Sequence, residues 1–156
     1  MNKKTFSIFA VLLTITLLFP ITVKADTASK PVISNEIIYQ DENYTIEVTT
    51  IIEENSITPY ATTQTKTVSK ISNVKDSFGS IVATYTLKGT FRYDGTSATC
   101  TNATYTTSTN SIFCSFENAT AYASGAKAIG SFTVKTLIKT ISETVSITCS
   151  STGVIS

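Results

Sequence analysis

The 156-residue chain has no histidine, no tryptophan and only three cysteines. Without histidine it cannot form a Ser-His-Asp triad or a Cys-His pair, and three scattered cysteines do not have the spacing of a zinc site. Two Ser-x-x-Lys matches, beginning at Ser72 and Ser124, lack the partner motifs that accompany this signature in serine β-lactamases and penicillin-binding proteins. We therefore expect a protein that is not an enzyme and that holds no metal and no cofactor.

Charge is also scarce, since charged residues make up 15% of the chain. The sequence has no basic cluster and no regularly spaced exposed aromatic residues, so nucleic acid is not an expected partner. It has no pattern typical of an amphipathic helix. It is rich instead in Thr and Ser, together with Val, Ile, Tyr and Phe, which suit a pleated, half-buried strand. The composition therefore indicates an all-β protein.

Residues 1–25 have the features of a secretory signal peptide. Two lysines precede an apolar run over residues 8–19, and Val-Lys-Ala at 23–25 supplies small residues where a signal peptidase cleaves. The run is shorter than the roughly 20 apolar residues of a membrane span. No cysteine follows the expected cut before Asp26, and the C-terminal SSTGVIS has no apolar tail. We therefore expect a secreted, extracellular product without a stable membrane anchor.

Residues 26–60 form an acidic segment. They include seven acidic residues and one lysine, whereas residues 61–156 include eight basic residues and four acidic ones. Pro59 and the stretch ATTQTKT that follows it mark a boundary near residue 60. Alternation of apolar and polar residues over 44–49 predicts a strand within the segment. Two interpretations remain open: an extra edge strand whose acids discourage pairing with other molecules, or a propeptide that is later removed.

The longest alternating pattern in the chain covers residues 81–93 and predicts a strand with one buried face. Gly89 is expected to mark a bend or a bulge in this strand. Asp94-Gly95 then fits a two-residue type I′ turn. Cys100, in the returning strand, points into the core in the resulting register. The expected pairs are Tyr93 with Thr96, Phe91 with Ala98, and Gly89 with Cys100.

Three further strands are expected at residues 111–116, 131–138 and 141–149, with turns at residues 75–79 and 124–130. Short strands at this spacing, with no helix, indicate an antiparallel β-sandwich or small barrel over residues 61–156. The tryptophan of an immunoglobulin-like domain is missing. In the last strand, Cys149 shares an apolar face with Ile141, Val145 and Ile147 and so also points toward the core.

The two inward cysteines suggest a covalent link. Export brings the chain to a compartment where thiols can oxidise. If the loop at residues 108–111 closes a hairpin, Cys114 lies opposite Ala103 and away from Cys100. We therefore predict a Cys100–Cys149 disulfide, with Cys114 free or available to a partner molecule. The alternative is that all three thiols stay reduced as small buried apolar groups.

The outward face of the long hairpin is the candidate contact surface. Lys88 and Arg92 lie on it as candidate surface contacts. Such a face suits contact with glycans or anionic cell-wall polymers, and it is equally typical of a sheet face that meets water. The hydroxyl groups around the two cations are those of Thr84, Thr86, Thr90, Ser97, Thr99 and Thr101.

Three stretches carry a resemblance to known proteins. They are ITPYAT at residues 57–62, VATYTLKGTFRYDGTSATCT at residues 82–101, and TVSITCSSTG at residues 144–153. Together with the signal peptide, this arrangement resembles small secreted β-rich proteins of Gram-positive bacteria that carry no assigned activity. Because the matching stretches are structural elements, the resemblance implies no functional residues.

Two functional hypotheses follow. The first is a secreted, non-enzymatic binding or interaction module of the bacterial cell envelope or exterior, which contacts cell-wall glycan, an anionic polymer or another protein. The second is a secreted precursor whose acidic segment is removed to release an active, antagonistic or toxin-like β domain.

Overall fold

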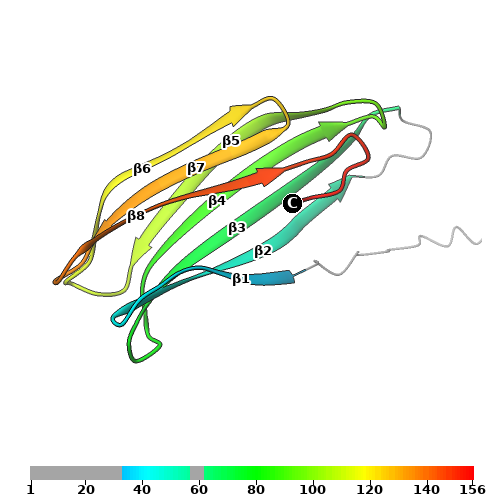
Figure 1. Ribbon diagram of the computed structural model, residues 1–156. Helices are drawn as coiled ribbons and strands as arrows, with labels where there is room; N and C mark the ends of the chain where they lie inside the picture. The colour runs from blue at the N-terminus through cyan, green and yellow to red at the C-terminus, as the bar shows by residue number, and fades with distance from the viewer. Residues whose placement is uncertain (1–32, 57–61) are drawn as a thin grey trace, which may run out of the picture.

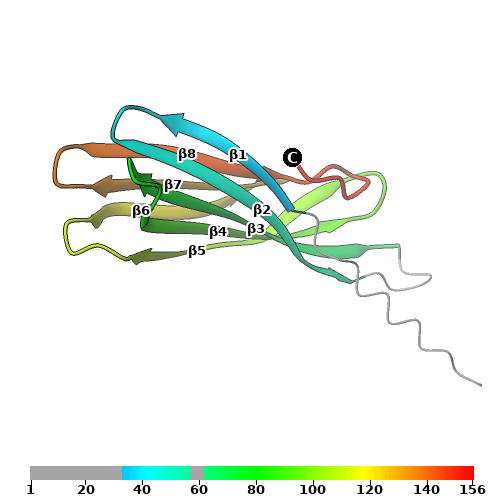
Figure 2. The same cartoon turned by 90° about the horizontal axis from the view of Figure 1, so that it is seen from below.

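The computed structural model describes residues 33–56 and 62–156, which form two antiparallel sheets (Figure 1). The larger sheet has five strands in the order β1-β2-β3-β4-β5, and the smaller sheet has three in the order β6-β7-β8. Two views show the smaller sheet lying along the larger one (Figures 1 and 2). The expected antiparallel all-β fold is therefore confirmed, as two sheets with a core between them. The expected signal peptide lies outside the described residues.

Each strand pairs with its neighbour in the sequence, apart from the step between β5 and β6 that changes sheets. β7 packs over β4 and β5, and β8 packs over β3 and β4. The described residues contain no helix long and apolar enough to cross a membrane. The strands are β1 (Ile33–Gln40), β2 (Tyr44–Ser56), β3 (Gln64–Asp76), β4 (Ile81–Tyr93), β5 (Ala98–Thr109), β6 (Ser115–Ser124), β7 (Lys127–Lys135) and β8 (Thr140–Thr148).

β4 confirms the long alternating strand predicted from the sequence. Tyr85, at its centre, is fully buried and stacks on Phe132 of β7, with 4.7 Å between the ring centroids. The Tyr85 hydroxyl donates a 2.6 Å hydrogen bond to the backbone carbonyl of Thr120 in β6. Burial raises the pKa of Tyr85 to about 12, so its hydroxyl keeps its proton. The inward side chains of β4 that are buried are Ala83, Tyr85, Leu87, Phe91 and Tyr93.

The turn after β4 is longer than the two-residue turn predicted at Asp94-Gly95. It has four residues, and Phe91 of β4 pairs with Cys100 of β5. The Asp94 carboxylate accepts hydrogen bonds from the backbone N–H groups two and three residues later, which stabilises the longer turn. The predicted register was therefore wrong by two residues next to the turn, and Gly89 lies opposite Ala103 in place of Cys100. Because a shift of two keeps every side chain on its face, Cys100 still points inward.

Gly89 allows the two sheets to approach each other closely. A Cβ atom at this position would lie 2.9 Å from the Cβ of Ala128 in β7 and 2.8 Å from the Phe91 ring. The pairing of β4 with β5 shifts between Thr90 and Phe91. The irregularity predicted at Gly89 is therefore present, one residue further along the strand.

The strands after β5 depart further from the predicted ones. The expected strand at residues 111–116 is mostly a turn, and β7 begins at Lys127, inside an expected turn. β5 and β6 belong to different sheets, so the predicted pairing of Cys114 with Ala103 is not formed. The second half of β5, residues 104–109, is exposed on both faces. Its sequence therefore lacks the alternation of apolar and polar residues that is typical of a half-buried strand. β8 confirms the last predicted strand.

Residues 33–56, within the expected acidic segment, form β1 and β2. The strand predicted over residues 44–49 is confirmed as part of β2. β2 lies between β1 and β3, and its Ile46 and Val48 are 0% and 3% exposed. The segment therefore supplies core side chains as well as the edge of the larger sheet.

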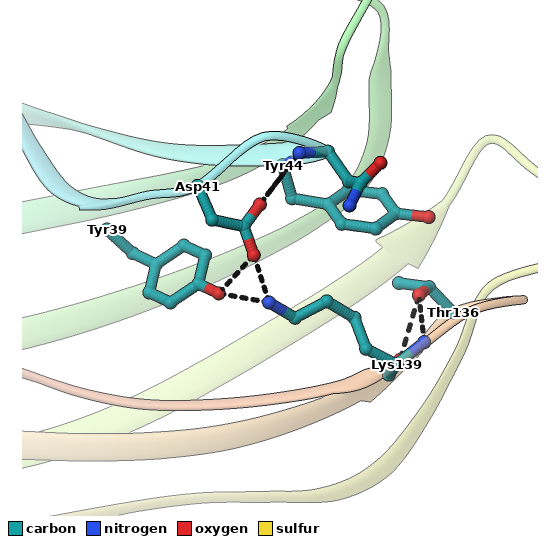
Figure 3. Close-up of polar contacts among 6 residues, drawn as sticks. Tyr39, Asp41, Tyr44, Thr136 and Lys139 are labelled. Carbon is teal, nitrogen blue, oxygen red and sulfur yellow. Dashed lines mark hydrogen bonds and ion pairs between the residues drawn. The ribbon is translucent and has the colours of Figure 1, made fainter.

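A polar cluster ties the β1–β2 turn to the smaller sheet (Figure 3). Lys139, in the β7–β8 turn, forms an ion pair with Asp41 and donates a hydrogen bond to the Tyr39 hydroxyl. Asp41 also accepts hydrogen bonds from Tyr39 and from the backbone N–H groups of Asn43 and Tyr44. These contacts, with that of Lys139 the largest, hold the pKa of Asp41 well below its usual range. The cluster fixes the edge of the larger sheet against the smaller one.

Candidate functional site

The outward face of the larger sheet is a broad field of hydroxyl groups. Alternate residues of β4 point away from the core, and their cross-strand neighbours on β3 and β5 share that direction. Each hydroxyl can donate one hydrogen bond and accept others. The accessible hydroxyl groups of the face are those of Thr65 from β3, Thr84, Thr86 and Thr90 from β4, and Thr99, Thr104 and Thr106 from β5, together with the cations Lys88 and Arg92; Thr67 and Ser69 share the direction but are buried.

Lys88 is held by a carboxylate. Its ammonium forms an ion pair with Glu53 of β2, and the other carboxylate oxygen of Glu53 accepts a 2.6 Å hydrogen bond from the Ser69 hydroxyl. The contact with Lys88, followed by that with Ser69, lowers the pKa of Glu53. The charge of Lys88 is therefore balanced within the sheet, which makes it the weaker of the two predicted surface contacts.

Arg92 lies at the other end of this face, beside a hollow of about 240 Å³. Among the described residues Arg92 forms no ion pair. Its planar guanidinium has five N–H donors in a fixed geometry that matches carboxylate and phosphate groups. The hollow therefore combines an available cation with several hydroxyl groups. Its walls are Thr63, Arg92, Tyr93, Asp94, Ser97, Thr99 and Thr101.

Asp94 forms the acidic wall of the hollow. Its carboxylate accepts hydrogen bonds from the backbone N–H groups of Ser97 and Thr96 and lies within hydrogen-bond distance of the Ser97 hydroxyl. The backbone of Ser97, followed by that of Thr96, lowers the pKa of Asp94, which is therefore ionised and engaged in the turn. A carboxylate that is bonded within its turn, beside an arginine and several hydroxyl groups, makes a wall suited to binding polar groups.

Sequence reasoning placed Lys88 and Arg92 on one face, and the structure has both there with different surroundings. It missed Thr63, which lies in the stretch interpreted as a linker, and it did not consider Asp94 as a wall of the site. The sequence did contain a signal for Thr63: the stretch ATTQTKT is as rich in threonine as the outward faces of the strands, which favours a strand over a linker.

The predicted Cys100–Cys149 disulfide is absent from the structure, in which all three cysteines are buried free thiols. The two residues nevertheless lie together: the backbone N–H of Cys100 bonds to the carbonyl of Gly125, and that of Cys149 bonds to the carbonyl of Ala126. Since Gly125 and Ala126 form the β6–β7 turn, both cysteines lie at that end of the sandwich.

Cys114 lies at the opposite end of the sandwich, in the segment between β5 and β6. Its backbone N–H bonds to the carbonyl of Ser111. Burial raises the pKa of Cys114, and it is also the largest cause of the raised pKa values of Cys100 and Cys149. The thiolate form of each is therefore disfavoured, which makes all three poor nucleophiles.

No three His, Cys, Asp or Glu side chains within residues 33–56 and 62–156 lie together as metal ligands would. No protein-family model, no curated protein and no solved structure matches this chain.

Proposed function

We propose that this protein is a secreted, non-enzymatic binding module of the bacterial cell envelope or exterior. Its contact surface is the hydroxyl-rich outward face of the larger sheet, centred on the hollow beside Arg92, and its partner is an anionic cell-wall polymer. The observation that carries the proposal is that Arg92 forms no ion pair among the described residues while hydroxyl groups line the hollow beside it. Export is part of the proposal and is supported by the N-terminal sequence.

The Arg92 side of the hollow favours an anionic, hydroxylated polymer over a neutral glycan, since the one carboxylate of the hollow, Asp94, is bonded to backbone N–H groups of its own turn. Neutral sugars commonly stack on exposed aromatic rings, and the aromatic wall of this hollow, Tyr93, is only 8% exposed. A phosphate or carboxylate accepts paired hydrogen bonds from a guanidinium. Polymer hydroxyls then bond to the threonine and serine side chains around it. The extended, regular face allows several weak contacts to add along one polymer chain.

The packing of β2 argues against release of an active domain by removal of residues 26–60. Ile46 and Val48 are buried, so their loss exposes apolar surface of the core. The loss also leaves the long edge of β3 unpaired, an edge that readily associates with other chains. We therefore do not adopt the precursor hypothesis.

Retention on isolated Gram-positive cell walls tests the proposal. We expect the purified protein to sediment with the walls at low salt. Salt should release it by screening the attraction between exposed charges, and soluble polyphosphate should release it by competing for the same site. Arg92→Gln is expected to weaken retention about tenfold, the scale of one lost charge-assisted contact. Thr99→Val, which removes a hydroxyl group at nearly constant shape, is expected to weaken it less.

Matched controls lie on the outward face of the smaller sheet. Lys127→Gln removes an exposed cation there, and Thr144→Val removes an exposed hydroxyl group. Both variants should be retained like the wild type. Absence of retention at low salt, or equal losses in Arg92→Gln and Lys127→Gln, would contradict the proposal.

A further inference from the structure

Large apolar side chains protrude from the turns at one end of the sandwich. Of the ten large apolar side chains that are exposed among the described residues, five lie on three turns. Phe78 is in the β3–β4 turn, Ile112 and Phe113 follow β5, and Leu137 and Ile138 are in the β7–β8 turn. Their exposed fractions are 92%, 93%, 60%, 73% and 60%. We call these five residues the apolar tips.

The three turns lie at the same end of the sandwich. Successive strands run antiparallel, so the turns that follow β1, β3, β5 and β7 gather at one end, the left end in Figures 1 and 2. Asn110, after β5, donates hydrogen bonds from its backbone to the carbonyl of Val82 and from its side chain to that of Ile81, at the start of β4. Lys139 of the β7–β8 turn holds Asp41 of the β1–β2 turn (Figure 3). The apolar tips therefore all protrude at the same end of the sandwich.

Hydrogen bonds within each turn hold the apolar tips outward. The Asp76 carboxylate accepts hydrogen bonds from the backbone N–H groups of Phe78 and Ser80. The Ser111 hydroxyl accepts a hydrogen bond from the backbone N–H of Phe113. The Thr136 hydroxyl donates a hydrogen bond to the backbone carbonyl of Lys139 and accepts one from the backbone N–H of Lys139. Because these backbone groups are bonded within the protein, the turns can enter an apolar phase without leaving those groups unpaired.

We infer that this end of the protein docks on a lipid bilayer with zwitterionic headgroups and inserts the apolar tips into its interface. The apolar tips protrude from separate turns, and lipid chains can flow around each of them because the bilayer is fluid. The hollow at this end, which runs from Ile37 to Gly79 along the β1–β2 and β3–β4 turns, is lined by none of them. A partner protein would need a concave or continuous apolar surface instead. The inference concerns the opposite end from Arg92 and does not depend on the proposed function.

The charges around the tips favour a neutral membrane surface. The three lysines nearest the tips are each paired with a carboxylate: Lys75 with Glu47, Lys135 with Glu117, and Lys139 with Asp41. Glu42 and Asp76 form no ion pair within the described residues. Without an unpaired cation this end has no attraction to anionic lipids, and its remaining carboxylates are repelled by them.

Single-tryptophan reporters test the inference in the full chain, which has no tryptophan of its own. Phe113→Trp places the reporter at the tips. Tyr122→Trp places it at an exposed position, near the β6–β7 turn at the other end. On addition of phosphatidylcholine vesicles, we expect the emission of Phe113→Trp to shift to the blue and its quenching by acrylamide to fall, while Tyr122→Trp stays unchanged. Unchanged emission from Phe113→Trp at high lipid, or equal shifts from both reporters, would overturn the inference.

Vesicle sedimentation gives an independent readout. Phe78→Ser and Ile112→Ser are each expected to lower partitioning onto phosphatidylcholine vesicles about tenfold, because each removes a large apolar side chain from the inserted group. Val154→Ser removes an exposed apolar side chain at the far end and should leave partitioning unchanged. Binding that appears only on vesicles containing phosphatidylglycerol would overturn the charge argument. A dimer in sedimentation velocity that Ile112→Ser converts to a monomer would assign the tips to self-association and overturn the inference.

Discussion

Cys100 and Cys149 lie side by side, with their backbone N–H groups bonded to the consecutive carbonyls of Gly125 and Ala126 at 2.7 and 3.0 Å. Cys100 belongs to β5 of the larger sheet, and Cys149 follows β8 of the smaller sheet. Their hydrogen bonds to the β6–β7 turn therefore join the two sheets at that end. Cys114 lies at the opposite end of the sandwich. The arrangement therefore makes one pair of the three thiols adjacent and leaves the third apart.

Oxidation during folding, while the thiols are still accessible, is expected to select that pair. Refolding of the reduced, unfolded chain in a mixture of reduced and oxidised glutathione should join Cys100 to Cys149 and leave Cys114 as a thiol. The bond closes a loop of about 50 residues and should stabilise the fold by roughly 4 kcal/mol in the chain-entropy model. Peptide mapping under non-reducing conditions identifies which cysteines are linked, and unfolding in denaturant measures the change in the free energy of unfolding. Recovery of a Cys100–Cys114 link, or of all three as alkylated thiols, would contradict this prediction.

Gly130→Ala is expected to destabilise the core. The added Cβ would overlap the Tyr85 hydroxyl and lie 3.1 Å from Cδ1 of Leu87, so the hydrogen bond from Tyr85 to Thr120 could not persist. The free energy of unfolding should fall by about 2–3 kcal/mol, from overpacking and from the lost bond. Tyr85→Phe removes the overlapping oxygen. The double variant should therefore be more stable than the sum of the single losses predicts; simple additivity in urea unfolding would count against this packing.

The Asp41–Lys139 pair should make stability depend on pH. The folded-state pKa of Asp41 is depressed below its ordinary value of 3.8, so the unfolded chain binds the proton more readily. The stabilisation is complete above about pH 5 and is lost as pH falls below that. We expect the Tm of the wild type to fall more steeply with acid than that of Asp41→Asn. In a Lys139→Met background the difference between the two slopes should narrow, because only the contacts of Asp41 with Tyr39 and the backbone remain, and parallel curves in all four proteins would refute the assignment.

The acidic segment is expected to be indispensable to the fold. Ile46→Ala should cost about 2–5 kcal/mol of unfolding free energy, the range for deleting a buried isoleucine side chain. A chain that begins at Ala61 should show no dispersed amide spectrum and should aggregate, because β3 loses its partner β2. A monomeric, native-like spectrum from that shortened chain would restore the precursor hypothesis.

Sequence reasoning succeeded where one face of a strand is buried and the other meets water. β4 illustrates this, because burial of every second residue forces apolar and polar side chains to alternate. It failed in the following turn, where the Asp94 side chain accepts hydrogen bonds from the backbone N–H groups of Thr96 and Ser97 and so stabilises a four-residue turn in place of the two-residue one. Gly95 has a positive φ of 87° in this longer turn.

The candidate site was predictable only in part. The outward direction of Lys88 and Arg92 follows from strand period, but the carboxylate partner of Lys88 comes from β2, and no local pattern pairs Lys88 with Glu53. The apolar tips were missed for a similar reason. Leu137 and Ile138 were assigned to a strand, although two adjacent apolar residues break the alternation of a half-buried strand and are therefore a usable signal.

Mapping of bound polyanion by amide chemical shifts tests the central claim most directly. Polyphosphate titrated into the isotope-labelled protein at low salt should shift the amides of Arg92, Ser97, Thr99 and Thr101, which line the hollow. The shifts should vanish in Arg92→Gln and persist in Lys127→Gln. Absence of shifts at low salt, or shifts confined to the smaller sheet or to the apolar tips, would contradict the assignment of the hydroxyl-rich face as the binding surface.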